Sequence, residues 1–307
     1  MIDKDKTNFL DDAHALLLQQ DAHNGMEMVF RGLKARRDAS TAEDWQNFVS
    51  SDVLTHPIKD LVHLCPFTNH SFFKPRGYSG DAGLIDYIYG EGAAKRLQLD
   101  SLASAIAQYT TNAPAARAVR YRRELLARRI DEVAANEKNP FMLSIAAGHL
   151  REIEWSQAAL NGQLGRLHAL DQDKDSVDLI QREYGRYNVS ASVGSVRQIL
   201  NGKIKFNRLS LVYAAGLFDY LVDKVAQKLV ETMFSFLKPG GRMLVANFLP
   251  NVPDVGYMES YMDWSLIFRN REDMLKLFET LPQNQVGNLI VSFDPDENIV
   301  FVEAIKK

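Results

Sequence analysis

The chain has 307 residues, a formal net charge of −3 and 46% hydrophobic residues. This length allows one large or two modest domains with a sizeable core. The balance of charge gives no general attraction for nucleic acid or for an anionic membrane. A single cysteine, Cys65, excludes an intrachain disulfide framework and fits a reducing compartment. The first residues lack an apolar signal core, and no apolar run reaches the roughly 20 residues that span a bilayer, so we expect a cytoplasmic protein.

Residues 1–135 predict a helical domain. Apolar residues recur at helical spacing in the stretches 10–18, 26–33 and 82–89. The stretch 63–81 is rich in loop-forming residues. A strongly basic helix is expected over 114–130, where the i, i+3 rule places Arg117, Arg120 and Arg123 near one face. These arginines favour either a solvated basic face or a carboxylate clamp, and Arg120 is our candidate for the clamp.

Residues 136–307 predict an α/β domain, because short apolar runs alternate with amphipathic stretches. The expected parallel strands are 141–146, 167–170, 187–192, 209–214 and 242–248. Lys238-Pro-Gly-Gly241 predicts the turn that enters the fifth strand. The last two runs, 286–293 and 299–305, are joined by so short a turn that they must pair as antiparallel neighbours. A parallel sheet closed by an antiparallel hairpin differs from an ordinary dinucleotide-binding fold.

The end of the first predicted strand is the strongest indication of a ligand site. The strand passes through Ala146, Ala147 and Gly148 into a helix start. Small residues let the backbone press against a ligand, and the helix start offers unpaired N–H groups. Asp171 follows the second strand about 20 residues later, where a carboxylate can accept both hydroxyls of a ribose. Nicotinamide binding is the main competitor, and the incomplete glycine pattern and the closing hairpin weigh against it.

These features resemble the class I S-adenosylmethionine-dependent methyltransferases over residues 135–307. More narrowly, the segments Lys74–Asp81, Ser144–Glu152 and Tyr213–Tyr220 look like a subgroup with a helical N-terminal region. That subgroup is associated with making a 3-hydroxypalmitate methyl ester signal, and enzymes that cyclise S-adenosylmethionine to azetidine-2-carboxylate look similar. The chain departs from the family pattern, which has an acid at Ser144 and glycines at Ala146 and Leu150. The departures leave open which group holds the ammonium of the cofactor.

The resemblance implies a Rossmann-like fold and a set of cofactor-binding residues. Ala146 and Gly148, with Ser144 before them, would back the methionine and ribose of S-adenosylmethionine. Asp171 would hold the ribose hydroxyls with Gln172 beside it. The segment Gly194, Ser195 and Val196 would pack on the adenine. The remaining cofactor-binding candidates are Ala214, Ala215, Phe218, Arg76 and Arg120, and Tyr213 would face the sulfonium.

Several of these candidates have structural alternatives. The loop 74–81 with Arg76 and Tyr78 is either a lid over the active site or a structural turn. Phe218 is either an aromatic wall for the sulfonium or a core residue, and Asp219 is either a general base or a helix N-cap. Tyr220 completes the catalytic candidates. The potential metal ligands His63, Cys65 and His70 lack a second cluster and fall short of a site.

Other positions extend the hypothesis beyond the cofactor. His149 is expected to pack within the turn. Asn247, Tyr261, Trp264 and Arg269 are candidates for the substrate side, although the aromatic segment 258–264 would equally form a partner surface.

The expected activity is methyl transfer to a small molecule, with a carboxylic acid oxygen as the acceptor, in secondary metabolism or signalling. The helical domain is expected to roof the site. A carboxylate acceptor needs alignment and desolvation more than acid–base help, which fits a sequence without an obvious catalytic dyad. Two alternatives remain open: cyclisation of S-adenosylmethionine with release of methylthioadenosine, and a non-catalytic cofactor-binding partner protein. We expect no nucleic-acid or membrane partner, and the oligomeric state stays open.

Overall fold

The computed structural model describes residues 8–92, 94–96 and 98–307 and divides the chain into two compact units. The helical unit comprises Met1–Val119 with Asn251–Ser265, and the sheet unit comprises Arg120–Pro250 with Leu266–Lys307. This division differs from the expected boundary at residue 135. The late segment returns to the helical unit because the Asp254 carboxylate accepts hydrogen bonds from the Ala115 N–H at the start of the basic helix, 3.2 Å from each oxygen.

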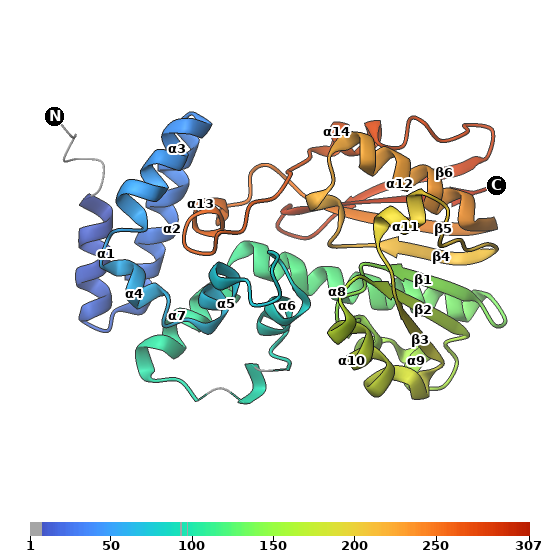
Figure 1. The fold of residues 1–307 in the computed structure, drawn as a ribbon, viewed down its shortest axis with the longest axis horizontal. Coiled ribbons are helices and arrows are strands. Elements are labelled where there is room, and N and C mark those ends of the chain that lie inside the picture. Colours follow the sequence, from blue (N-terminus) through green and yellow to red (C-terminus); the bar gives the residue numbers. More distant parts are fainter. Residues whose placement is uncertain (1–7, 93, 97) are drawn as a thin grey trace. The chain divides into compact units, whose positions relative to one another are not determined.

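The helical unit is built mainly from short helices (Figure 1). Its elements are α1 (Asn8–Leu18), α2 (Ala22–Asp38), α3 (Ala42–Phe48), a π-helix (Val49–Val53), α4 (Ile58–Val62), α5 (Pro66–Phe73), α6 (Ala82–Tyr89), a 3-10 turn (Ala94–Arg96), α7 (Ser101–Thr111) and α13 (Val255–Glu259). Helix α8 (Pro114–Asn136) begins in this unit and continues into the other. Helix α2 packs on α1, α7 and α13, and buries Met26, Val29 and Leu33 at helical spacing.

One stretch of the helical unit differs from its expected form. We expected 63–81 to be mostly loop, yet α5 occupies residues 66 to 73 of it. Proline is favourable at the first position of a helix, because its missing N–H would have no helical partner there, and Pro66 takes that place. Lys74 ends the helix in the left-handed conformation, at φ 47°.

The sheet unit holds a seven-stranded sheet in the order β3-β2-β1-β4-β5-β7-β6. The strands are β1 (Phe141–Ile145), β2 (Arg166–Asp171), β3 (Val189–Val193), β4 (Leu209–Ala214), β5 (Leu237–Phe248), β6 (Val286–Phe293) and β7 (Ile299–Lys306). The first five run parallel, while β7 pairs antiparallel with both β5 and β6. This arrangement confirms the predicted parallel sheet with its antiparallel closing hairpin.

Helices of this unit cover the sheet and close its core. They are α9 (Gln157–Leu160), α10 (Lys174–Tyr184), α11 (Val196–Leu200), α12 (Asp223–Phe236) and α14 (Arg271–Lys276), with 3-10 turns at Arg151–Trp155, Gly185–Tyr187 and Phe218–Tyr220. Helix α10 packs on β2 and β3, and α12 on β4 and β5. Every residue of β4 is buried, as expected for the centre of a parallel sheet covered on both faces.

The segment Lys238–Gly241 is part of β5 rather than a turn before it. Strand β5 begins at Leu237, and its pairing with β4 shifts register between Leu209 and Leu211, so the segment forms an irregularity within the strand. Gly241 is required there, because a Cβ atom would lie 2.6 Å from the Leu209 carbonyl oxygen of the neighbouring strand.

Candidate functional site

The turn after β1 has the backbone of a three-glycine loop, although only one of the three residues is glycine. Ala146, Gly148 and Leu150 have φ angles of 52°, 55° and 54°, all in the left-handed region. For the alanine and the leucine this conformation costs about 1–2 kcal/mol each. The positions are the ones at which the resemblance places glycine. Two of the three positions thus carry residues other than glycine, and all three have the left-handed conformation.

Asp171 at the end of β2 is tied directly to this turn. Its Oδ2 atom accepts a hydrogen bond of 2.7 Å from the Gly148 N–H, and its Oδ1 atom accepts one of 2.9 Å from the Asp173 N–H. Burial raises the pKa of the Asp171 carboxyl, and the two backbone hydrogen bonds oppose that rise. A carboxylate has about four acceptor positions, so each oxygen keeps a lone pair for one further donor. The geometry therefore fits the two hydroxyls of a ribose.

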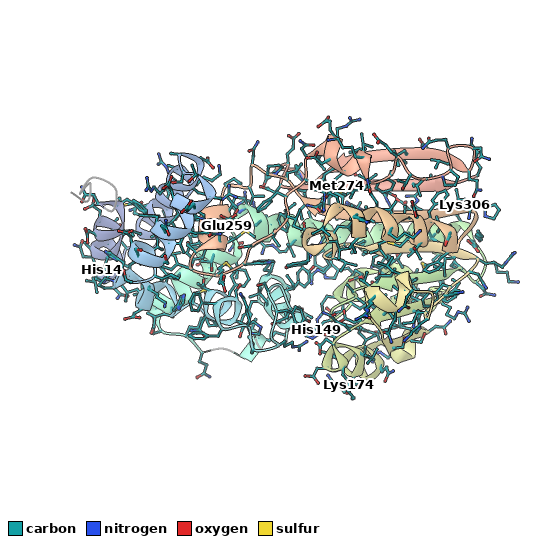
Figure 2. The ribbon with its side chains drawn as sticks, turned by 45° about the horizontal axis from the view of Figure 1, so that its top comes forward. His14, His149, Lys174, Glu259, Met274 and Lys306 are labelled. Carbon is teal, nitrogen blue, oxygen red and sulfur yellow. The ribbon has the colours of Figure 1, made fainter. Side chains whose placement is uncertain are left out.

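Parallel strands bring these residues to the same edge of the sheet. Ile145 pairs with Leu170 at the ends of β1 and β2, and the Ala147 N–H donates to the Leu170 carbonyl at 3.2 Å. Figure 2 labels His149 within this turn and Lys174 at the start of α10, which follow the two strands. His149 is buried, as expected for a residue that packs in the turn.

The segment predicted to lie against adenine has structural roles of its own. A Cβ atom on Gly194 would lie 2.6 Å from side-chain atoms of both Ile204 and Leu170. Ser195 caps α11, because its hydroxyl accepts from the Gln198 N–H while the Gln198 side chain accepts from the Ser195 N–H. Gln172, beside Asp171, is exposed. These roles explain the residue types without a ligand, and the contact with adenine stays a prediction.

A buried polar network lies below the turn, between β1 and β4. Ser144 pairs with Tyr213 across the two strands, and their hydroxyl groups are hydrogen-bonded. The Tyr213 hydroxyl also donates to Glu152 Oε1 at 2.7 Å, from the 3-10 turn that follows the loop. Burial raises the pKa of the Glu152 carboxyl, and the tyrosine hydrogen bond opposes that rise. Tyr213, a candidate for the sulfonium, is thus held by a carboxylate that the sequence interpretation had not singled out.

Arg122 of α8 is buried, and its charge acts on the Glu152 carboxylate of this network. It is 8% exposed, and its Nη1 atom donates to the Ala215 carbonyl oxygen at 2.7 Å. A Cβ atom on Gly216 would lie 3.4 Å from the same nitrogen. The neighbouring Arg123 is also buried, with its guanidinium 4.2 Å from the ring centre of Trp155. Arg120, the predicted clamp, is half-buried.

The residues after β4 form a second buried cluster. Phe218 is fully buried among core residues, and Ala214 is buried with it, whereas Tyr220 is 40% exposed. Asp219 accepts a 2.7 Å hydrogen bond from the Phe248 N–H, and burial raises its pKa to about 6. The N-cap alternative for Asp219 is wrong, since α12 begins at Asp223 with Val222 as its cap.

Two candidates for the substrate side are structural partners of this cluster. Arg269 is 2% exposed and donates at 2.8 Å both to the Phe218 carbonyl and to Asn247 Oδ1. It also pairs with Asp223 at 2.8 Å. Asn247 donates in turn to the Ile267 carbonyl at 2.8 Å. The two side chains hold together the loops that follow β4 and β5.

The loop with Arg76 and Tyr78 lies in the helical unit. Gly77 and Gly80 have positive φ angles of 82° and 71°, as tight turns require. Asp81 caps α6 through the Leu84 N–H and also pairs with His70 at 2.9 Å. At the other end Lys74 pairs with Asp263 of the same unit. The structure thus documents the structural-turn role, and a role over the active site stays a prediction.

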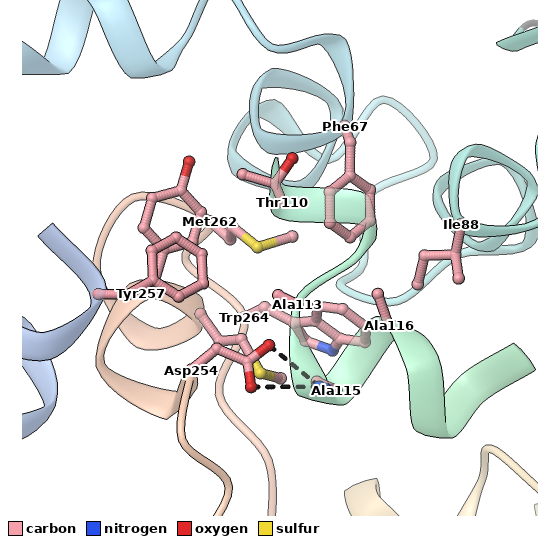
Figure 3. Close-up of a pocket in the computed structure, with 12 residues that line it drawn as sticks. Phe67, Ile88, Thr110, Ala113, Ala115, Ala116, Asp254, Tyr257, Met262 and Trp264 are labelled. Atoms are coloured by element: carbon pink, nitrogen blue, oxygen red, sulfur yellow. Dashed lines mark hydrogen bonds between the residues drawn. The ribbon is translucent and has the colours of Figure 1, made fainter. Parts of the chain in front are cut away.

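Figure 3 shows an apolar cavity in the same unit. Phe67, Tyr257 and Trp264 line it, and the Asp254 carboxylate lies at its wall on the Ala115 N–H. The free space inside it is about 10 Å³, at the lower limit of what holds a single water molecule. In this conformation the cavity has no room for a substrate, so the turn after β1 remains the better candidate site.

Among the described residues, no three His, Cys, Asp or Glu side chains gather in a group that could hold a metal ion. His63 contacts the Tyr261 carbonyl oxygen at 3.0 Å, and Cys65 contacts Thr110. No described helix is both long and apolar enough to cross a bilayer.

Comparison with known proteins shows that this chain is similar in fold to solved structures. No family model and no curated protein matches the sequence. A solved structure named a possible exported protein, from Bordetella parapertussis, has a TM-score of 0.62 at 14% identity and covers 88% of this chain and 98% of its own. Magnesium protoporphyrin IX methyltransferase of Synechocystis has a TM-score of 0.48 at 11% identity, covering 72% of this chain and 92% of its own.

A putative O-methyltransferase from Nostoc punctiforme also has a TM-score of 0.48, at 13% identity, and covers 81% of this chain and 71% of its own. The Bordetella structure, at 14% identity, shows the fold alone.

Proposed function

We propose that the protein binds S-adenosylmethionine at the turn after β1 and transfers its methyl group to a small molecule. One observation carries the proposal. The turn keeps the left-handed backbone of a glycine loop at Ala146, Gly148 and Leu150, and its central N–H is tied to the carboxylate of Asp171. Two strained non-glycine residues persist only where the surroundings impose them, and such strain is concentrated at ligand sites.

The described residues fit the proposed cofactor. Ala146 is exposed at the tip of the turn, so a ligand can approach the backbone there. Asp171 retains an acceptor position on each oxygen for the ribose, and Gly194 to Val196 follow the next strand at the same edge. When bound, S-adenosylmethionine supplies a methyl group on a positively charged sulfur. The residues of the turn would orient the ligand, and the buried aromatic Tyr213 would help to exclude water from it.

The proposed acceptor is a carboxylic acid oxygen of a small molecule, and we propose that the protein acts in the cytoplasm. Attack by a carboxylate on a sulfonium neutralises both charges, so alignment and exclusion of water supply much of the rate. Three acids that follow strands β1, β2 and β4 each hold a structural hydrogen bond: Glu152 with Tyr213, Asp171 with two backbone N–H groups, and Asp219 with the Phe248 N–H. This arrangement suits a reaction that needs no general base.

The test is to incubate the purified protein with S-adenosylmethionine, alone and with a panel of small carboxylic acids, and to identify the products by mass. The proposal predicts S-adenosylhomocysteine and a methyl ester only when an acceptor is present. Methylthioadenosine with a cyclic amino acid, formed without any acceptor, would show cyclisation instead. Binding without any product across a broad panel would indicate a cofactor-binding protein without catalysis.

A further inference from the structure

Strand β1 has no acid at Ser144 that could bind the ammonium of the proposed cofactor. Ser144 stands where the resemblance places an acid, and a serine hydroxyl carries no charge. The Ser144 hydroxyl is hydrogen-bonded to Tyr213, and Tyr213 donates to Glu152. One hydroxyl group thus separates Ser144 from a carboxylate that comes from the far side of the turn.

Glu152 is an unusual residue to find buried at this point. It is 7% exposed and lies in a 3-10 turn whose other acid, Glu154, reaches away to Arg151 and Tyr184. A buried carboxylate is costly unless charge or hydrogen bonds compensate it. The Tyr213 hydroxyl and the backbone N–H of Glu152 itself donate to the carboxylate, and the charges of Arg122 and Arg123 favour its ionised form. These two donors leave part of the roughly four acceptor positions of a carboxylate open. The carboxylate therefore keeps acceptor capacity for a cationic group.

Arg122 complements Glu152 in charge at the end of β4. Its one hydrogen bond within the described chain goes from Nη1 to the Ala215 carbonyl. A guanidinium carries five N–H donors, so further donors have no protein acceptor among the described residues. The flat guanidinium matches a carboxylate with two parallel hydrogen bonds. Gly216, which has no side chain, lies against it.

We propose that Glu152 and Arg122 recognise the amino-acid end of S-adenosylmethionine, Glu152 binding its ammonium and Arg122 its carboxylate. The inference rests on the proposed function and adds to it a replacement for the acid absent at Ser144. Tyr213 is a positioning residue in this site, because its hydroxyl fixes the orientation of the Glu152 carboxylate. The acidic partner has moved from the strand to the far side of the turn, eight positions along the chain from 144 to 152.

The test is a calorimetric comparison of four ligands with the full-length protein. The ligands are S-adenosylhomocysteine, its analogue without the amino group, its analogue without the carboxylate, and methylthioadenosine, which lacks both. Glu152→Gln should lose about 10- to 100-fold in affinity for the two ligands that carry the amino group and keep its affinity for the other two. Arg122→Gln should lose a similar factor for the two ligands that carry the carboxylate and keep its affinity for the other two.

Two matched controls come from the same elements. Glu154→Gln changes the acid of the same turn that faces away, and Arg128→Gln changes an exposed arginine of α8. Both should bind all four ligands as the wild type does. Equal loss of all four ligands in Glu152→Gln, or no loss of any, would overturn the proposal.

If a variant fails to fold, ligand affinities of the wild type alone can still refute the proposal. The proposal requires it to bind S-adenosylhomocysteine at least about 10-fold more tightly than the analogue without the amino group. Equal affinity for all four ligands would overturn the amino-acid site while leaving the proposed cofactor in place. Binding of none of the four would refute the proposed function itself.

Discussion

Replacing Asp171 by asparagine tests the link between the turn and the proposed ribose site. The wild-type carboxylate accepts from the Gly148 N–H at 2.7 Å and from the Asp173 N–H at 2.9 Å. The asparagine side chain has one acceptor oxygen, so its NH₂ group must face one of these two donors. One backbone N–H then loses its partner, which should lower the free energy of unfolding by about 1–3 kcal/mol.

The same substitution should weaken cofactor binding. The amide no longer offers a charged acceptor to both ribose hydroxyls, and a hydrogen bond to a charged group contributes about 1.5–3 kcal/mol. We therefore expect about a 10- to 100-fold loss in affinity for S-adenosylhomocysteine by calorimetry, under conditions where the variant is folded. Asp173→Asn is the control, because this side chain caps α10 instead. A folded Asp171→Asn variant with wild-type affinity would refute the ribose assignment.

Three further predictions concern stability, measured by urea unfolding. Ala146→Gly should relieve the left-handed strain and stabilise the protein by up to about 1 kcal/mol, whereas any destabilisation would show that the turn is not strained. Gly241→Ala should destabilise by about 1–3 kcal/mol, because its Cβ atom would lie 2.6 Å from the Leu209 carbonyl, and a neutral result would mean that β5 adjusts freely. Burial raises the pKa of Asp219 to about 6, so the folded wild type loses stability as the pH rises from about 4 to about 6. Asp219→Asn should remove this loss and gain about 2–3 kcal/mol on the wild type by pH 7, and an equal pH dependence in both proteins would contradict the assignment.

The sheet could be predicted from the sequence because each strand and the final turn are indicated by neighbouring residues. The run 209–214 is apolar apart from Ser210 and forms β4 over the same residues, and the short turn before 299 dictates the antiparallel hairpin. The start of β5 was misplaced, since Pro and Gly within Lys238–Gly241 are typical of a turn and only the pairing with β4 shows that the strand has already begun. In the helical unit, loop-forming residues near Pro66 concealed the short helix α5.

The candidate site was predicted in part. The turn and Asp171 follow from small residues at a strand end and an acid at the next one. Glu152 escaped notice because nothing in the order of residues shows that a 3-10 turn directs one acid inward to Tyr213 and another outward to Arg151. Arg122 was passed over for a similar reason: the i, i+3 rule groups arginines on a helix, and only the packing of α8 shows which of them is buried.

The central claim is that the cofactor binds at the turn after β1, and hydrogen exchange with and without S-adenosylhomocysteine tests it most directly. The account predicts slower amide exchange on ligand addition in peptides that cover residues 146–152 and 171–173, with Gly148 among the protected amides. Peptides from α1 and α2, far along the chain from this turn, serve as the internal reference. Unchanged exchange in 146–152 and 171–173 at saturating ligand, or protection confined to other peptides, would contradict the claim.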